Sequence, residues 1–240
     1  MDTDFHHDIT HNEEHLKSSA ALTDIVIGMS DGLTVPFALA AGLSGAIDNS
    51  NIIVIACIAQ IAAGSIAMGL GGYLSGKTEQ DHYKNEVKRE NHEIENLRHK
   101  EIAETKEFFA GLGLSEEVQN KATEEISRDK NKWVDFMKKY QLGLEKTDPK
   151  RATKSALNIG ISYIVGGIIP LSPYFFIDDA QEALKYSAVA TLLCLFMLGY
   201  FKSKITGVNP LLGALRVTLI GAAAAAAAAA AFGVAKLFEH

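Results

Sequence analysis

The chain has 240 residues, of which 48% are hydrophobic and 22% are charged, and its formal net charge is −6 at pH 7. That negative charge argues against nucleic acid as a partner, because polyphosphate backbones select for concentrated positive charge. Cys57 and Cys194 both lie inside apolar runs, so we expect small buried side chains there and neither a disulfide framework nor a cysteine metal site.

Charge is unevenly distributed along the chain. Residues 77–154 contain 17 of the 23 Lys and Arg residues, whereas long stretches on both sides are nearly free of charge. A transmembrane helix needs about 20 mostly apolar residues to cross about 30 Å of hydrocarbon. The pattern therefore predicts an all-α, polytopic membrane protein with a charged insert.

Residues 1–19 are predicted to form an acidic, His-rich N-terminal tail. They lack the basic region and the apolar core of a cleavable signal peptide. His7, His11 and His15 share helical spacing and imidazole is a common metal ligand, but we prefer a disordered tail without a fixed site.

Residues 20–76 are predicted to hold the first two transmembrane helices, over 20–47 and 52–76. Asp24 and Asp31 would lie on nearly one face of the first helix, about 10 Å apart along its axis. Ionisable side chains inside a span are costly and usually face a polar pathway or a partner. The alternative is an interfacial Asp24 and a protonated, structural Asp31. Pro36 would free a backbone carbonyl just beyond them.

The second span places Gln60, Gly64 and Met68 at i, i+4 and i+8, on one side of a helix. A methionine thioether beside a carboxylate makes a mixed soft and hard site. Such a site suits a borderline ion such as Fe²⁺ better than Ca²⁺ or Mg²⁺, which take oxygen ligands. Packing is the alternative for a membrane methionine, and the proximity of Asp31 favours the ligand.

The insert, 77–151, is predicted to be a cytosolic domain of three helices that continues from the second span. The helices are expected over 79–108, from Ser115 onward and around 129–142, with a break at Gly111-Leu-Gly113. On a straight first helix, six glutamates fall within an arc of about 80° that contains no Lys or Arg. They are Glu79, Glu86, Glu90, Glu93, Glu101 and Glu104. Stacked like charges are destabilising unless a cation neutralises them, so the stripe indicates a metal-binding face, with a solvated acidic face as the alternative.

Residues 152–240 are predicted to hold transmembrane helices three to five, over 152–171, 184–202 and 210–236. Lys and Arg follow the second and fourth spans and precede the third, whereas 48–51 has none and 172–183 is acidic. Because positive charge stays on the cytosolic side, the N-terminus and the insert are predicted to be cytosolic.

Four separated motifs follow one another along the chain. They are SDGLTVPFALAAGLSGA (30–46), QIAAGSIAMGLGGYLSGKTEQDHY (60–83), WVDFMKKYQLGLEKTDPKRA (133–152) and NPLLGALRVTLIG (209–221). Together they resemble the vacuolar iron transporter family, from about residue 18 onward. The resemblance implies a homodimer with five transmembrane helices per protomer, which exchanges Fe²⁺, and often Mn²⁺ or other divalent ions, for protons. It places the ion path at the dimer interface, between the first two spans of each protomer.

The resemblance also implies roles for single residues. Asp31 and Met68 match the central translocation pair, and Asp24 matches an upstream carboxylate. The cytosolic metal ligands of the family match Glu90, Glu93, Glu101, Glu104 and Met137. Gln60 and Gln141 stand where the family usually has glutamate, so proton coupling and metal affinity are expected to differ here, because an amide carries no charge.

The expected function is proton-coupled export of divalent transition metals from the cytosol, by a secondary transporter and not an enzyme. The host membrane would be a vacuolar membrane in a eukaryote or the inner membrane in a bacterium. Fe²⁺, Mn²⁺, Co²⁺ and Zn²⁺ are the expected transported or bound ions, with no permanent cofactor, and the sequence does not rank Fe²⁺ against Mn²⁺. Two alternatives stay open: a membrane-anchored di-iron oxidase built on the glutamate helix, and a metal-responsive membrane sensor without flux.

Overall fold

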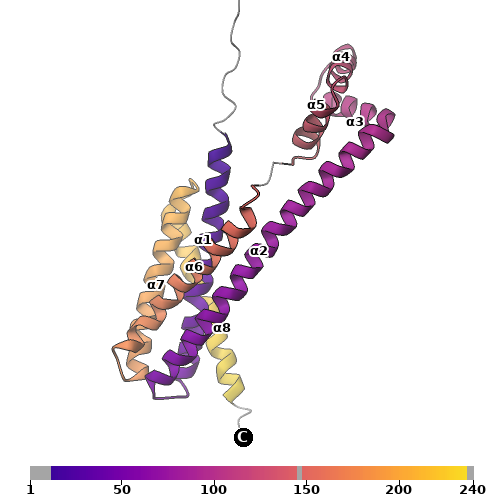
Figure 1. Ribbon diagram of the computed structural model, residues 1–240. Helices are drawn as coiled ribbons and strands as arrows, with labels where there is room; N and C mark the ends of the chain where they lie inside the picture. The colour runs from indigo at the N-terminus through magenta and orange to yellow at the C-terminus, as the bar shows by residue number, and fades with distance from the viewer. Residues whose placement is uncertain (1–11, 145–147, 237–240) are drawn as a thin grey trace, which may run out of the picture. The chain divides into compact units, whose positions relative to one another are not determined.

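A computed structural model describes residues 12–144 and 148–236, and over these residues all regular elements are helical (Figure 1). The α-helices are α1 (Asn12–Ser44), α2 (Ser50–Asn96), α3 (Arg98–Gly111), α4 (Glu116–Ser127), α5 (Lys130–Phe136), α6 (Arg151–Leu171), α7 (Ala180–Ile205) and α8 (Pro210–Lys236). A π-helix covers Met137–Gln141 and a 3-10 helix covers Ser172–Phe175. The predicted all-α fold class is confirmed.

The chain divides into two compact units. One comprises Leu74–Arg151 and is called the insert unit below; the other comprises the segments before and after it and is called the membrane unit. Four helical segments are long and apolar enough to cross a membrane, and they are Ala20–Ser44, Ser50–Asn96, Arg151–Phe175 and Ala180–Ile205. In α8 the apolar segment found among the described residues is the shorter Pro210–Ala224, so the fifth span stays a prediction.

Most predicted helix ends agree with the structure. α8 begins at Pro210, and the Asn209 side chain accepts hydrogen bonds from the backbone N–H groups of Leu211 and Leu212, at 3.1 and 3.2 Å. α1, however, begins at Asn12, so residues 12–19 of the predicted tail belong to the first helix. His6, His7 and His11 lie outside the described residues.

Glycines let helices of the membrane unit approach one another closely. A Cβ on Gly28 or Gly32 of α1 would collide with the backbone carbonyl oxygens of Ile159 and Tyr163 on α6. A Cβ on Gly166 of α6 would lie 2.8 Å from the carbonyl oxygen of a residue in α1. Lipid tails are as apolar as leucine, so helices in a membrane associate through close packing of small residues. This packing fixes the position of α6 against the segment of α1 that carries Asp31.

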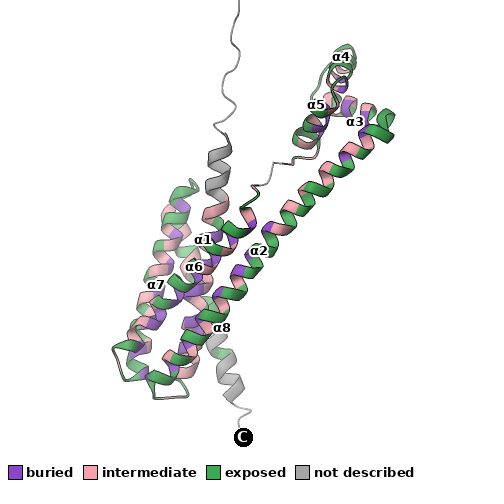
Figure 2. Ribbon diagram, in the orientation of Figure 1, coloured by how far each residue is buried: buried purple, intermediate pink, exposed green. Residues whose placement is uncertain are grey.

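Both cysteines are free thiols; Cys57 is buried, as predicted, whereas Cys194 is only half-buried. Cys57 belongs to an apolar cluster with Ile53 of α2, Leu171 of α6 and Ala183 of α7. Figure 2 shows buried residues along the inward sides of these helices and exposed residues on their outer faces. The exposed apolar side chains of these helices are consistent with a lipid environment.

The predicted single helix over 79–108 was wrong. α2 ends at Asn96, Leu97 leaves the helical conformation at φ −124° and ψ 32°, and α3 begins at Arg98. The Asn96 side chain donates to the backbone oxygen of His92 at 2.9 Å, a local bond that competes with continuation of the helix. The insert unit therefore contains the end of α2 and three further α-helices. The prediction of three helices was one helix short, because it joined the end of α2 and α3 into a single helix.

The rest of the insert unit follows the predicted order. α3 ends at Gly111, and Gly113 has a positive φ of 79°, which favours glycine. Asp129 caps α5 by accepting from the backbone N–H groups of Asn131 and Lys132. Ser115 occupies the cap position before α4, but its side chain makes no cap hydrogen bond. A core of Ile94, Trp133, Val134 and Met137 joins α2 to α5 and the π-helix.

Candidate functional site

Three carboxylates converge where α2 meets α3. Glu90 and Glu93 lie in the last two turns of α2, and Glu101 lies in the first turn of α3. One oxygen from each lies within 4.8 Å of the other two, close enough for a single metal ion. On a straight helix, residues 90 and 101 would be separated by about 16 Å along the axis. These carboxylates therefore meet because the helix breaks at Leu97. A common face on one straight helix would have left them far apart.

Two of the three carboxylates are buried, and three of their four oxygens have no hydrogen-bond partner. Glu101 is fully buried, and neither of its carboxylate oxygens has a hydrogen-bond partner. Glu90 is 3% exposed, and its Oε1 also lacks a partner. A buried polar group without a partner costs on the order of 1–3 kcal/mol, and more when it is charged. A bound cation would remove that cost.

The clustering changes how these groups bind protons. Burial, followed by the charges of Glu101 and Glu93, raises the pKa of Glu90 from 4.5 to about 7. Burial, followed by the charge of Glu104, also raises the pKa of Glu101. Near neutral pH Glu90 is therefore partly protonated. A metal ion must displace that proton, because metal ligands bind in the deprotonated form.

Glu104, a fourth predicted ligand, has a different environment. One of its oxygens lies 2.9 Å from Nζ of Lys100, and the other accepts a hydrogen bond from Nε2 of Gln141 at 2.8 Å. The hydrogen bond from Lys100 is the main cause that lowers the pKa of Glu104. Glu104 thus lies beside the group of three as an ionised, already paired carboxylate, and Gln141 supports it as a donor.

Basic side chains reach the acidic stripe from neighbouring positions. The guanidinium of Arg89 pairs with Glu86 at 2.8 Å and lies 3.9 Å from a carboxylate oxygen of Glu93. Lys100 pairs with Glu104 in the same way. The stripe itself contains no Lys or Arg, but basic residues just outside it, at i+3 or i−4 from these glutamates, reach across the helix surface and compensate part of its charge. Glu101 has no such ion pair among the described residues.

Met137 and Trp133 are connected to Glu101 through Thr105. The hydroxyl of Thr105 accepts from Nε1 of Trp133 at 2.8 Å, and it lies 2.7 Å from the backbone oxygen of Glu101 and 3.4 Å from Sδ of Met137. All of these side chains are buried. The predicted role of Met137 as a ligand stays a prediction, since its sulfur already contacts a hydroxyl. The sequence reasoning missed Thr105, although its position at i+4 from Glu101 was a usable signal.

The predicted membrane residues lie apart from this cluster in the sequence and have distinct environments. Asp24 is 3% exposed and accepts a hydrogen bond from the Ser155 hydroxyl of α6 at 3.0 Å. Asp31 and Met68 are half-buried. Within the described part of the chain, the carboxylate of Asp31 makes no hydrogen bond or ion pair, so its oxygens are available to a ligand.

Gln60 has a partner that the sequence reasoning did not identify. Its Nε2 donates to the hydroxyl of Tyr163 on α6 at 2.6 Å, while its Oε1 is buried without a partner. Tyr163 is 2% exposed. A tyrosine in the middle of an apolar span was the available signal, because a buried phenol hydroxyl usually has a hydrogen-bond partner.

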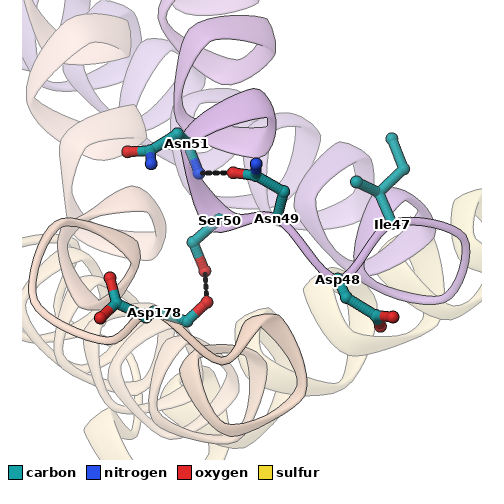
Figure 3. Close-up of a pocket in the computed structure, with 6 residues that line it drawn as sticks. All are labelled: Ile47, Asp48, Asn49, Ser50, Asn51 and Asp178. Carbon is teal, nitrogen blue, oxygen red and sulfur yellow. Dashed lines mark hydrogen bonds between the residues drawn. The ribbon is translucent and has the colours of Figure 1, made fainter.

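Figure 3 shows a small polar pocket where the loop between α1 and α2 meets the segment before α7. The Ser50 hydroxyl donates to the backbone oxygen of Asp178 at 2.8 Å, and the Asn51 N–H donates to the side chain of Asn49 at 2.9 Å. Asp48 and Asp178 are exposed, so this is a solvated loop region and not a metal centre.

The long apolar helices and the insert with its buried carboxylate group define the class of helical integral membrane proteins with a charged insert. A family model narrows this class. The chain belongs to the VIT family, whose model matches residues 22–233.

Relatives from plants and a fungus match most of the chain. "Vacuolar iron transporter 1" of Tulipa gesneriana is 50% identical over 229 residues, which cover 95% of this chain and 92% of that protein. "Vacuolar iron transporter 1" of Arabidopsis thaliana is 48% identical and covers 96% of this chain and 91% of its own length. "Vacuolar iron transporter cccA" of Arthroderma benhamiae is 34% identical, with 85% and 75% covered. The predicted family is confirmed.

Proposed function

We propose that this protein moves Fe²⁺ from the cytosol into a vacuole, in exchange for protons. The names of its relatives support iron as the cargo and the vacuolar membrane as the location. The single observation that carries the proposal is the group of three carboxylates, two of them buried, with three buried oxygens that have no hydrogen-bond partner. Such a group is costly in a soluble or membrane protein unless a cation binds to it.

In this proposal the insert unit captures the ion. Glu90, Glu93 and Glu101 supply oxygen ligands, and Glu104 adds negative charge beside them. Carboxylate oxygen coordinates both Fe²⁺ and Mn²⁺, so Mn²⁺ is proposed as a second cargo. Binding expels the proton held by Glu90, which makes capture depend on cytosolic pH.

The membrane unit then carries the ion across. Asp31 and Met68 bind it at the centre of the path, with Asp24 nearer the cytosol and Gln60 deeper. Deprotonated Asp31 binds the ion and protonated Asp31 releases it, so a proton gradient drives export. The proposal includes a fifth span formed by α8, a cytosolic N-terminus and insert unit, and a second copy of the chain across the path.

The test is transport by the purified protein in proteoliposomes, with Fe²⁺ supplied anaerobically and a pH-sensitive dye inside. Flux of Fe²⁺ is expected with counter-movement of protons, and Asp31→Asn is expected to abolish both. Asp48→Asn, which changes an exposed loop carboxylate, is the matched control and should transport normally. Normal flux in Asp31→Asn would refute the mechanism.

Two results would favour the alternatives. Metal binding without flux by the wild-type protein indicates a sensor, and metal-dependent oxygen consumption without flux indicates an oxidase. The structure offers a reason to prefer transport over oxidation: the metal-compatible group found among the described residues contains carboxylates only, whereas di-iron bundles also use histidine. Parallel assays with Mn²⁺, Co²⁺ and Zn²⁺ measure selectivity.

A further inference from the structure

Tyr163 of α6 lies between the two helices that carry the proposed ion path. A Cβ on Gly32, the residue after Asp31, would collide with the backbone oxygen of Tyr163. A Cβ on Gly64 of α2 would collide with its hydroxyl oxygen and lie 2.6 Å from its Cζ. The backbone of this tyrosine is thus packed against α1, and its ring lies over Gly64, between the levels of Gln60 and Met68.

The hydroxyl of Tyr163 holds one end of the Gln60 carboxamide. Nε2 of Gln60 donates to this hydroxyl at 2.6 Å, and Oε1 of Gln60 is buried with no hydrogen-bond partner. A carboxamide has a donor end and an acceptor end in one plane, so fixing the nitrogen fixes the direction of the oxygen. An amide oxygen without a donor is a ligand for a divalent cation, and leaving it unpaired costs free energy in the absence of one.

We propose that Tyr163 is a positioning residue of the ion path, which orients Gln60 so that its carbonyl oxygen coordinates the divalent cation at the level of the path deeper than Asp31 and Met68. This inference rests on the proposed transport function. The role needs no titration: the phenol accepts a hydrogen bond and Gln60 stays neutral. The hydrogen bond between Tyr163 and Gln60 therefore supplies an oxygen ligand at a position where the chain has no second carboxylate.

Tyr174 provides a matched comparison within the same unit. It is 3% exposed, and its hydroxyl shares a hydrogen bond of 2.9 Å with the hydroxyl of Ser44. Tyr163→Phe and Tyr174→Phe each delete one buried hydroxyl and one hydrogen bond, so they should lower the melting temperature in detergent by similar amounts. Only Tyr163→Phe releases the amide of Gln60, and a purely structural role predicts equal effects on transport.

The experiment measures the initial rate of Fe²⁺ uptake into proteoliposomes against Fe²⁺ concentration. Tyr163→Phe is expected to lower Vmax/KM about tenfold, mainly through KM, because a cation ligand is no longer held in place. Tyr174→Phe is expected to transport as the wild type does. In a Gln60→Ala background, Tyr163→Phe is expected to have no further effect, because it acts through Gln60. Equal transport by Tyr163→Phe and wild type, or a full additional loss in the Gln60→Ala background, would overturn the inference.

A second variant keeps the inference testable if Tyr163→Phe folds poorly. Gly64→Ala retains every polar group but places a methyl group where the phenol now lies, and it is expected to reproduce the rise in KM. Gly71→Ala on the same helix, where an added Cβ meets nothing within 4 Å, is the control and should transport normally. Wild-type kinetics in Gly64→Ala would count against the inference. Absence of flux in the wild type would instead refute the proposed transport function, so the two failures are distinguishable.

Discussion

Replacing Glu101 with glutamine should stabilise the metal-free insert unit and abolish its metal binding. Glu101 is fully buried, both of its oxygens lack donors, and it lies within 4.8 Å of two other carboxylates. Glutamine has nearly the same shape, removes one negative charge and supplies an amide N–H that Glu90 can accept. The variant therefore loses metal binding and gains stability in the metal-free state, a trade-off that is common at binding sites.

The magnitude follows from the pKa of Glu90. Its rise from 4.5 to about 7 corresponds to about 3 kcal/mol of unfavourable free energy for the ionised form. Burial is the largest cause and the charge of Glu101 the second, so removing that charge should recover about 1 kcal/mol.

The sign follows from proton linkage. A carboxyl with a raised pKa binds protons more tightly in the folded state, so its stabilising effect is complete below pH 4.5 and is lost as the pH rises through about 7. The free energies of unfolding of Glu101→Gln and wild type should thus differ little at pH 5 and by about 1 kcal/mol near pH 8.

The assay is denaturant unfolding of the full-length protein in detergent with a metal chelator, followed by tryptophan emission. Trp133 is the only tryptophan in the chain and is fully buried beside the cluster, so its emission reports unfolding of the insert unit. Excess Mn²⁺ should stabilise the wild type and leave Glu101→Gln nearly unchanged. Glu124→Gln, at an exposed carboxylate paired with Arg128, is the control. A Glu101→Gln variant less stable than wild type at pH 8 would refute the reasoning.

Three further outcomes are expected. Lowering the pH from 8 to 6 should weaken Mn²⁺ binding to the insert unit about tenfold, because the proton held by Glu90 competes with the metal; calorimetry in buffers of different ionisation enthalpy should show proton release, and pH-independent affinity would contradict the assignment. Gly32→Ala should lower the free energy of unfolding by about 1–3 kcal/mol because its Cβ would collide with the α6 backbone; thermal melting measures this, with Gly71→Ala as the unaffected control. Gln141→Glu should tighten Mn²⁺ binding and destabilise the metal-free protein, since it replaces the donor to Glu104 with a second carboxylate. Titration measures the Mn²⁺ affinity and thermal melting measures the stability of the metal-free protein. An affinity and a melting temperature that both rise, or both fall, would contradict the prediction.

The sequence by itself determined the helical class, most helix ends and the candidate residues. Hydropathy and cap signals are local properties, so the apolar runs and Asn209-Pro210 predicted helices that the structure contains. Periodicity also selected Glu90, Glu93 and Glu101, but for an incorrect reason, since it assumed one straight helix.

The tertiary structure decided which of those carboxylates meet. A single non-helical residue, Leu97, redirects the chain and brings Glu101 to Glu90, and no residue pattern specified that turn angle. The partners of the glutamates, Arg89 and Lys100, and the pairing of Gln60 with Tyr163, likewise depend on which helix faces lie together. Long-range packing sets those contacts, and residues 103 positions apart in the chain share no local sequence signal.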